Sequence, residues 1–179
     1  MRYCVFCGSN GGARPSYASA TADLARRLVA EGIGIVYGGG NVGLMGVLAD
    51  TALAEGGEVV GVIPRMLVEK EIAHRGLSEL RVVGSMHERK ALMADLSDAF
   101  IAAPGGYGTL DEFCEILTWT QLGLQRKPIG MLNVDGYFDR LLALFDHAVT
   151  EQFVKPIHRD MIVTDDTPQS LIARMRVPG

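Results

Sequence analysis

Residues 99–112 read Ala99-Phe100-Ile101-Ala102-Ala103-Pro104-Gly105-Gly106-Tyr107-Gly108-Thr109-Leu110-Asp111-Glu112. The uncharged apolar run at its start, bounded by Pro and Gly, is typical of a strand that is buried on both faces of a sheet. The glycine-rich turn that follows leads directly into a segment with helical period. Strand, glycine turn and helix in immediate succession form the building unit of α/β proteins with a parallel sheet.

The same unit recurs along the chain. The pattern predicts strands over 3–7, 34–37, 58–63, 99–103, 129–132 and around 161–163, and helices over 15–31, 43–55, 86–96, 109–122, 138–151 and 168–174. The least regular segment, 64–85, holds a short strand at 80–83 and is a connection of the kind that contacts ligands in such folds. We therefore expect an α/β, Rossmann-like doubly wound parallel sheet with helices on both faces, formed by residues 1–179 as a single domain.

Composition limits the function classes. The 179 residues are 48% hydrophobic and 21% charged, with a formal net charge of −4, which disfavours a nucleic-acid surface but permits a small anionic ligand. No secretory h-region follows the first residues, and the uncharged stretch 32–49 is interrupted by Gly38-Gly39-Gly40-Asn41. We expect a cytoplasmic protein that makes no use of a membrane or of nucleic acid.

Cys4 and Cys7 form a C-x-x-C pair, which in other settings is redox-active or binds zinc. Here both fall inside the first predicted strand rather than at a helix start, and the sequence has no second cysteine pair to complete a zinc site. A structural role is therefore favoured, and we expect no metal.

Three glycine turns follow three predicted strands, at 7–12, 38–43 and 104–109. In a doubly wound sheet these turns share the carboxyl edge, so Ser9, Gly39 and Gly40 are candidate ligand contacts together with the third turn. The second turn fits G-x-G-x-x-G, but Ile63-Pro64-Arg65 stands where a dinucleotide site needs an acid. The sequence also has no P-loop.

The third turn carries the more specific signal. Backbone N–H groups of Gly106 to Thr109, with the Thr109 hydroxyl, would form an anion cradle at a helix start. Glu112 lies one turn further, within reach of a ribose whose 5′-phosphate occupies the cradle. The alternative is that Asp111 and Glu112 only complement the helix dipole, which suffices for Asp111.

A charged run, Met86-His87-Glu88-Arg89-Lys90, opens the preceding helix. Taken alone it is typical of a solvated helix start. Arg89 could reach Glu112 and keep that carboxylate ionised, which favours a functional role for the pair.

These motifs resemble the LONELY GUY (LOG) family, the cytokinin riboside 5′-monophosphate phosphoribohydrolases, long mislabelled as lysine decarboxylases. The similarity rests on Gly38 to Gly46, on Met86 to Lys90, on Pro104 to Glu112 as P-G-G-x-G-T-x-x-E, and on the flanks at 113–122 and 132–137. It covers nearly the whole chain.

The resemblance implies cleavage of the N-glycosidic bond of a purine nucleoside 5′-monophosphate, a dimer with active sites near the subunit interface, and no metal or organic cofactor. It places the catalytic pair on Arg89 and Glu112. The implied substrate contacts are Glu71, Arg89, Lys90, Gly105, Gly106, Tyr107, Gly108, Thr109, Glu112 and Thr118. The base that the resemblance implies is adenine or an N6-substituted adenine, and the sequence leaves that choice open.

Two alternatives belong to other classes of protein. A pyridoxal-phosphate decarboxylase would need a Schiff-base lysine, and none of Lys70, Lys90, Lys127 and Lys155 has such a setting. A non-catalytic carrier of a nucleotide or pterin cofactor would need the phosphate cradle but not the acid. The joint presence of Arg89 and Glu112 favours the enzyme.

Overall fold

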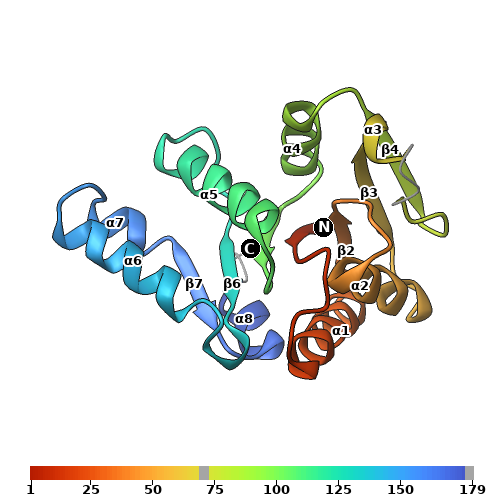
Figure 1. Ribbon diagram of the computed structural model, residues 1–179, viewed down its shortest axis with the longest axis horizontal. Helices are drawn as coiled ribbons and strands as arrows, with labels where there is room; N and C mark the ends of the chain where they lie inside the picture. The colour runs from red at the N-terminus through yellow and green to blue at the C-terminus, as the bar shows by residue number, and fades with distance from the viewer. Residues whose placement is uncertain (69–72, 176–179) are drawn as a thin grey trace.

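The apolar runs pair side by side into one parallel sheet of seven strands, in the order β4-β3-β2-β1-β5-β6-β7 (Figure 1). The computed structural model describes residues 1–68 and 73–175. The strands are β1 (Arg2–Phe6), β2 (Gly34–Tyr37), β3 (Val59–Pro64), β4 (Glu79–Val83), β5 (Ala99–Ala102), β6 (Ile129–Leu132) and β7 (Ile162–Asp165). The predicted strands are confirmed, β2 and β6 with the expected bounds and the others within about two residues.

Helices connect the strands. They are α1 (Pro15–Ala30), α2 (Gly43–Ala54), α3 (Arg65–Val68), α4 (Met86–Asp95), α5 (Tyr107–Gln121), α6 (Asp139–Thr150), α7 (Pro156–Arg159) and α8 (Pro168–Met175), with a 3-10 turn η1 (Val134–Gly136). The sequence did not predict α3, α7 or η1, because elements of three or four residues are too short to show a hydrophobic period. Within the described ranges, no helix is both long and apolar enough to cross a membrane.

The two faces of the sheet are covered by different helices. Leu24 of α1, Leu48 of α2 and Leu171 of α8 pack on the face that carries Ile35 and Ile101. Met93 of α4, Phe113 of α5 and the partly buried face of α6 pack on the opposite face. Successive strand residues point to opposite faces, so the central strands are apolar on both faces apart from Arg2 at the start of β1, as a doubly wound sheet requires.

The functional edge of the sheet follows from the strand order. From β1 the chain builds outward to β4, returns through α4 to β5, and then builds outward in the other direction. β1 and β5 are therefore neighbours, paired from Tyr3 with Ala99 to Phe6 with Ala102. The loops after them run to helices on opposite faces and leave a crevice at the carboxyl ends, where such sheets bind ligands. Gly8 N donates to Pro104 O at 3.0 Å and ties the two loops together.

Candidate active site

A cavity of about 450 Å³ opens at this switch point between β1 and β5. It is bounded by loops and helix ends that are far apart in the sequence. Its lining residues are Cys7, Ser9, Asn10, Met45, Leu67, Arg89, Gly106, Tyr107, Gly108, Thr109 and Glu112. The structure therefore brings together Ser9, Arg89, Glu112 and residues 106–109, all of which the sequence proposed as site residues.

The N-terminus of α5 forms one wall of the cavity. Gly106 is the N-cap residue, so no side chain caps this helix, and Gly106 O accepts from Leu110 N at 3.1 Å. By contrast, α4 is capped by Ser85, whose hydroxyl accepts from Glu88 N at 3.1 Å. The first N–H groups of a helix have no partner within the helix, and an anion is a favourable partner for them. The predicted anion cradle therefore lies at an uncapped helix start, and anion binding there stays a prediction.

Two glycines keep the space above the cradle open. A Cβ built on Gly106 or on Gly108 would meet no atom within 4 Å, and neither residue has a positive φ. Neither backbone strain nor packing therefore requires glycine there. Gly105 differs, because its Cβ would collide with the side chain of Thr109 and approach Gly8 N to 2.9 Å. Gly105 serves close packing, and Gly106 and Gly108 leave room that a bound phosphate can use.

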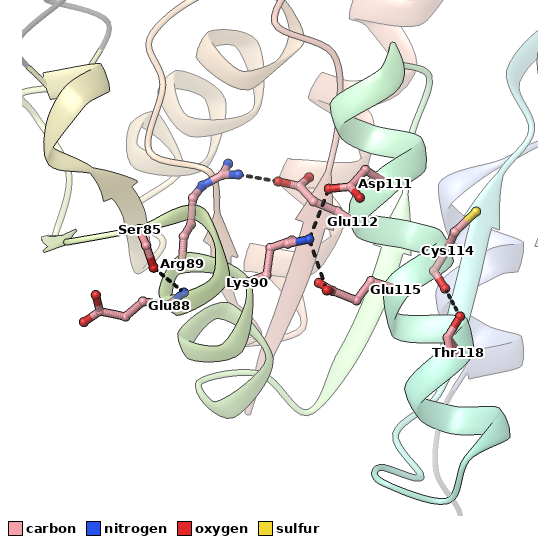
Figure 2. A network of polar contacts seen from close by, with 9 residues as sticks. All are labelled: Ser85, Glu88, Arg89, Lys90, Asp111, Glu112, Cys114, Glu115 and Thr118. Atoms are coloured by element: carbon pink, nitrogen blue, oxygen red, sulfur yellow. Dashed lines mark hydrogen bonds and ion pairs between the residues drawn. The ribbon is translucent and has the colours of Figure 1, made fainter.

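Arg89 and Glu112 form a buried ion pair across the cavity wall (Figure 2). Nη1 of Arg89 on α4 donates to Oε1 of Glu112 on α5 at 2.5 Å, and Nε of Arg89 donates to Val62 O at 3.0 Å. Arg89 is 7% and Glu112 8% exposed, so little water screens the pair. The guanidinium fixes the carboxylate one helical turn beyond the cradle.

Burial raises the pKa of Glu112 above the ordinary value of 4.5, and the positive charge of Arg89 opposes that rise. The carboxylate thus combines a desolvated position with a fixed counter-charge, which is typical of functional acids. Burial, and then the charge of Glu112, raises the pKa of the Cys7 thiol. Cys7 therefore stays protonated and is poorly suited to act as a nucleophile.

Lys90 does not face the cavity in this structure. Its Nζ lies 3.2 Å from Oδ2 of Asp111 and 3.1 Å from Oε1 of Glu115 (Figure 2). Burial alone would lower the pKa of Lys90, but its bonds to Glu115 and Asp111 outweigh that effect and the net pKa is raised. The side chain of Asp111 is 61% exposed. Glu112 and Asp111 thus have different surroundings although they are neighbours on one helix.

Three further predicted contacts do not line this cavity, and a fourth lies outside the described residues. Gly39 and Gly40 follow β2 and bond to residues 73–74: His74 N donates to Gly39 O at 2.9 Å, and Gly40 forms a bridge to Ala73. Thr118 lies on the side of α5 turned away from α4, where its hydroxyl donates to Cys114 O at 2.8 Å (Figure 2). Glu71 lies outside the described residues. Their contact with a ligand stays a prediction.

Sequence reasoning missed several residues that line the cavity. Asn10 stands in the first glycine turn, and Met45 follows the second, so their positions near strand ends were a signal. Leu67 belongs to α3, which gave no periodic signal. Met45 and Leu67 add apolar side chains to a lining that is otherwise largely polar or glycine.

A cavity built in this way suits a small anionic ligand with an electron-poor centre. An uncapped helix start is chemically suited to bind negative charge, and a buried carboxylate is suited to stabilise positive charge that develops near it. Among the described residues, no three His, Cys, Asp or Glu side chains are grouped as a metal site would need.

The chain is similar to known proteins over nearly its whole length. Residues 45–175 match a protein-family model described as "Possible lysine decarboxylase". The probable cytokinin riboside 5′-monophosphate phosphoribohydrolase LOGL1 of Oryza sativa subsp. japonica is 53% identical, and the match covers 97% of this chain and 78% of that protein. The cytokinin riboside 5′-monophosphate phosphoribohydrolase LOG3 of Arabidopsis thaliana is 48% identical over 97% of this chain and 81% of that protein.

Solved structures share the fold at much lower identity. The molybdenum cofactor binding protein of Rippkaea orientalis superposes with a TM-score of 0.73 over 97% of this chain and 93% of that chain, at 23% identity. Such a likeness concerns the Rossmann-like fold alone. The sequence similarity goes further: with relatives that are 48–53% identical over 97% of its length, the chain belongs to the family of the cytokinin riboside 5′-monophosphate phosphoribohydrolases.

Proposed function

We propose that the protein is a phosphoribohydrolase that cleaves the N-glycosidic bond of adenosine 5′-monophosphate or its N6-substituted forms. The products are the free base and ribose 5-phosphate. The observation that carries the proposal is the Arg89–Glu112 pair beside an open helix start, at 2.5 Å and more than nine-tenths buried. Relatives at 48–53% identity bear the name of this activity.

The reaction needs charge stabilisation more than a nucleophile. When the bond between C1′ and N9 breaks, its electron pair goes to the purine and positive charge builds on the ribose ring. Glu112 stabilises this charge and takes the proton of the water whose oxygen bonds to C1′. Arg89 orients Glu112 and, being always charged, does not supply the proton that the purine gains. Solvent water supplies that proton, and Glu112 returns the proton it took to the solvent, so the net reaction consumes one water molecule.

The ends of the substrate have separate partners. The phosphate binds the N–H groups of Gly106 to Thr109, with Ser9 opposite. The ribose lies toward Glu112, and Glu71 is the proposed contact on the base side. The apolar side chains of Met45 and Leu67 border the same cavity and accommodate the base. The phosphate is therefore part of what the site recognises, and a nucleoside without it should be a far poorer substrate.

Two other activities fit the site less well. A decarboxylase would need a neutral lysine to form a Schiff base, but Lys90 is paired with two carboxylates and its pKa is raised. A cofactor carrier has no need for a buried ionised acid beside the cradle, since burying one is costly.

Release of adenine from AMP, followed by chromatography, tests the proposal. Isopentenyladenosine monophosphate is compared in parallel, and adenosine is the control that lacks the phosphate. Turnover of either nucleotide with little turnover of adenosine is the expected result. Tight binding of nucleotide without any base release would favour a carrier.

We also propose a homodimer. Support comes from large apolar side chains that are exposed just after α5, just after α6 and on α7: Leu124 is 70%, Phe153 85% and Ile157 67% exposed. Thr118 belongs to this side of α5, so it would meet substrate only in a neighbouring subunit's cavity. Sedimentation of the wild type and of Phe153→Asp tests the dimer, which the acidic variant should weaken.

The proposed location is the cytoplasm. It agrees with the nucleotide substrate and with the three free cysteines, Cys4, Cys7 and Cys114. Fractionation of cells that express the protein with a small tag tests it.

A further inference from the structure

The guanidinium of Arg89 occupies the space where a side chain at position 38 would lie. Gly38 is the first residue after β2 and belongs to the turn that leads to α2. A Cβ built on Gly38 would approach Nη2 of Arg89 to well under 3.0 Å, a separation that real Cβ atoms essentially never show. Its other near neighbours, Cζ of Arg89 at 3.3 Å and Sδ of Met45 at 3.4 Å, are far less demanding.

Backbone conformation does not explain the glycine. Gly39, the next residue, has φ +74 and needs glycine on that ground, whereas Gly38 is not among the positive-φ residues of the described chain. An alanine at 38 would therefore suit the backbone and would conflict chiefly with one side chain.

That side chain has little freedom to move aside. Nε of Arg89 is fixed by Val62 O at 3.0 Å and Nη1 by Glu112 at 2.5 Å, and the residue is 7% exposed. Any displacement of Nη2 by a methyl group must tilt the planar guanidinium and so lengthen one or both of these bonds.

We infer that Gly38 is a positioning residue. Because glycine has no side chain, the Arg89 guanidinium can occupy the space beside residue 38 and keep the orientation in which it donates to Glu112. The inference rests on the proposed function for its activity readout and on geometry alone for its stability readout. It gives the second glycine turn a role that differs from ligand contact.

The test is a double-mutant cycle of Gly38→Ala with Arg89→Ala and with Arg89→Lys, whose unbranched ammonium has no atom equivalent to Nη2. Gly38→Ala alone should lower kcat for AMP roughly tenfold to a hundredfold, as misplacement of a supporting group does. In the Arg89→Lys background, adding Gly38→Ala should lower kcat by less than about threefold, because the lysine has no Nη2 atom for the new methyl group to displace.

Two further readouts separate positioning from a structural role. With Arg89 displaced, the pKa of Glu112 loses its main opposing influence, so the acid limb of the kcat profile should move to higher pH in Gly38→Ala. Among the described residues, the titratable groups that interact electrostatically with Glu112 are Arg89 and Lys90 from α4, Asp111 on α5, and the Cys4 and Cys7 thiols of the β1 region. The Gly38 variant changes none of these residues.

The thermal unfolding midpoint completes the cycle. Gly38→Ala should lower it by about 3 °C or more in the wild type and hardly at all in Arg89→Ala. Equal losses in both backgrounds, or wild-type turnover of Gly38→Ala, would overturn the inference. If the wild type releases no base from any nucleotide, the proposed function fails, and the midpoints still decide whether Gly38 accommodates Arg89.

Discussion

Replacing Glu112 with Gln removes one negative charge and keeps the shape of the side chain. Because Glu112 is 8% exposed and lies 2.5 Å from Arg89, its charge is not screened by water at the point where the ribose becomes positive. Loss of one preorganised electrostatic group of this kind costs about 10²–10³ in rate, or about 2.7–4 kcal/mol. Binding of the nucleotide should change little, since the cradle is intact.

Asp111 is the matched control. It has the same chemistry and adjoins Glu112, but its side chain is 61% exposed, and its partner Lys90, 3.2 Å away, is also paired with Glu115. Asp111→Asn should cost a few tenths of a kcal/mol, from dipole complementarity and one exposed pair, which is less than about a threefold change in rate.

The assay is single-turnover release of ribose 5-phosphate at saturating enzyme, with circular dichroism to verify that each variant folds. A folded Glu112→Gln enzyme with wild-type rate, beside an inactive Asp111→Asn, would refute the assignment of the acid. Normal rates in both variants would refute the role of the whole pair.

Four other outcomes follow from the structure. Gly108→Ala puts a methyl group into the open space above the cradle; KM for AMP should rise at least tenfold while the unfolding midpoint stays or increases, and an unchanged KM would remove residue 108 from the phosphate site. Glu112 must be ionised to act, and burial raises its pKa, so kcat should fall on acidification at a pH above 4.5; a limb at or below that value in the pH–rate profile would contradict the burial argument. Activity should survive EDTA, because the described residues hold no grouped metal ligands; loss of activity that zinc or magnesium restores would show an overlooked site. Hydrogen bonds from Ser170, Thr167 and Arg174 outweigh the effect of burial and lower the pKa of Asp165 to about 2, so the stability that ionised Asp165 contributes is present above about pH 4 and is lost as the pH falls toward 2. Asp165→Asn should therefore lower the free energy of unfolding in urea by about 1–2 kcal/mol at pH 7 and by much less at pH 2.5. Equal stability of variant and wild type at pH 7 would disprove this role of Asp165.

Local sequence signals predicted the elements well and their relations less well. β2 and β6 agree with the prediction residue for residue, because each is a buried run flanked by clear turn residues. The start of α5 was placed two residues late, at 109 instead of Tyr107, since a helix that begins with Gly106 as its N-cap has no capping side chain to mark it.

The part of the site that lies in one sequence motif could be predicted from the sequence. The part that forms where two distant segments come into contact could not. The cradle and Glu112 belong to one continuous segment, a turn and the first part of a helix. The helical period alone predicts that Glu112 and Asp111 point in different directions. The fit of Arg89 into the space beside Gly38 joins the turn after β2 to α4, and no local pattern encodes such a contact. The bonds of Gly39 and Gly40 to the 73–74 segment are of the same long-range kind.

The place of β1 between β2 and β5 also affects how the chain must fold as it is synthesised. Tyr3 pairs with Ile35 on one side and with Ala99 on the other, so the second neighbour emerges from the ribosome about 100 residues later. At roughly 5–20 residues per second, the apolar edge of β1 stays unpaired for about 5–20 s. An open edge of that kind invites pairing with other chains until β5 arrives. The two loops that build the cavity are joined only at that moment, so nascent chains that stop before residue 103 cannot hold the ligand and should depend on chaperones.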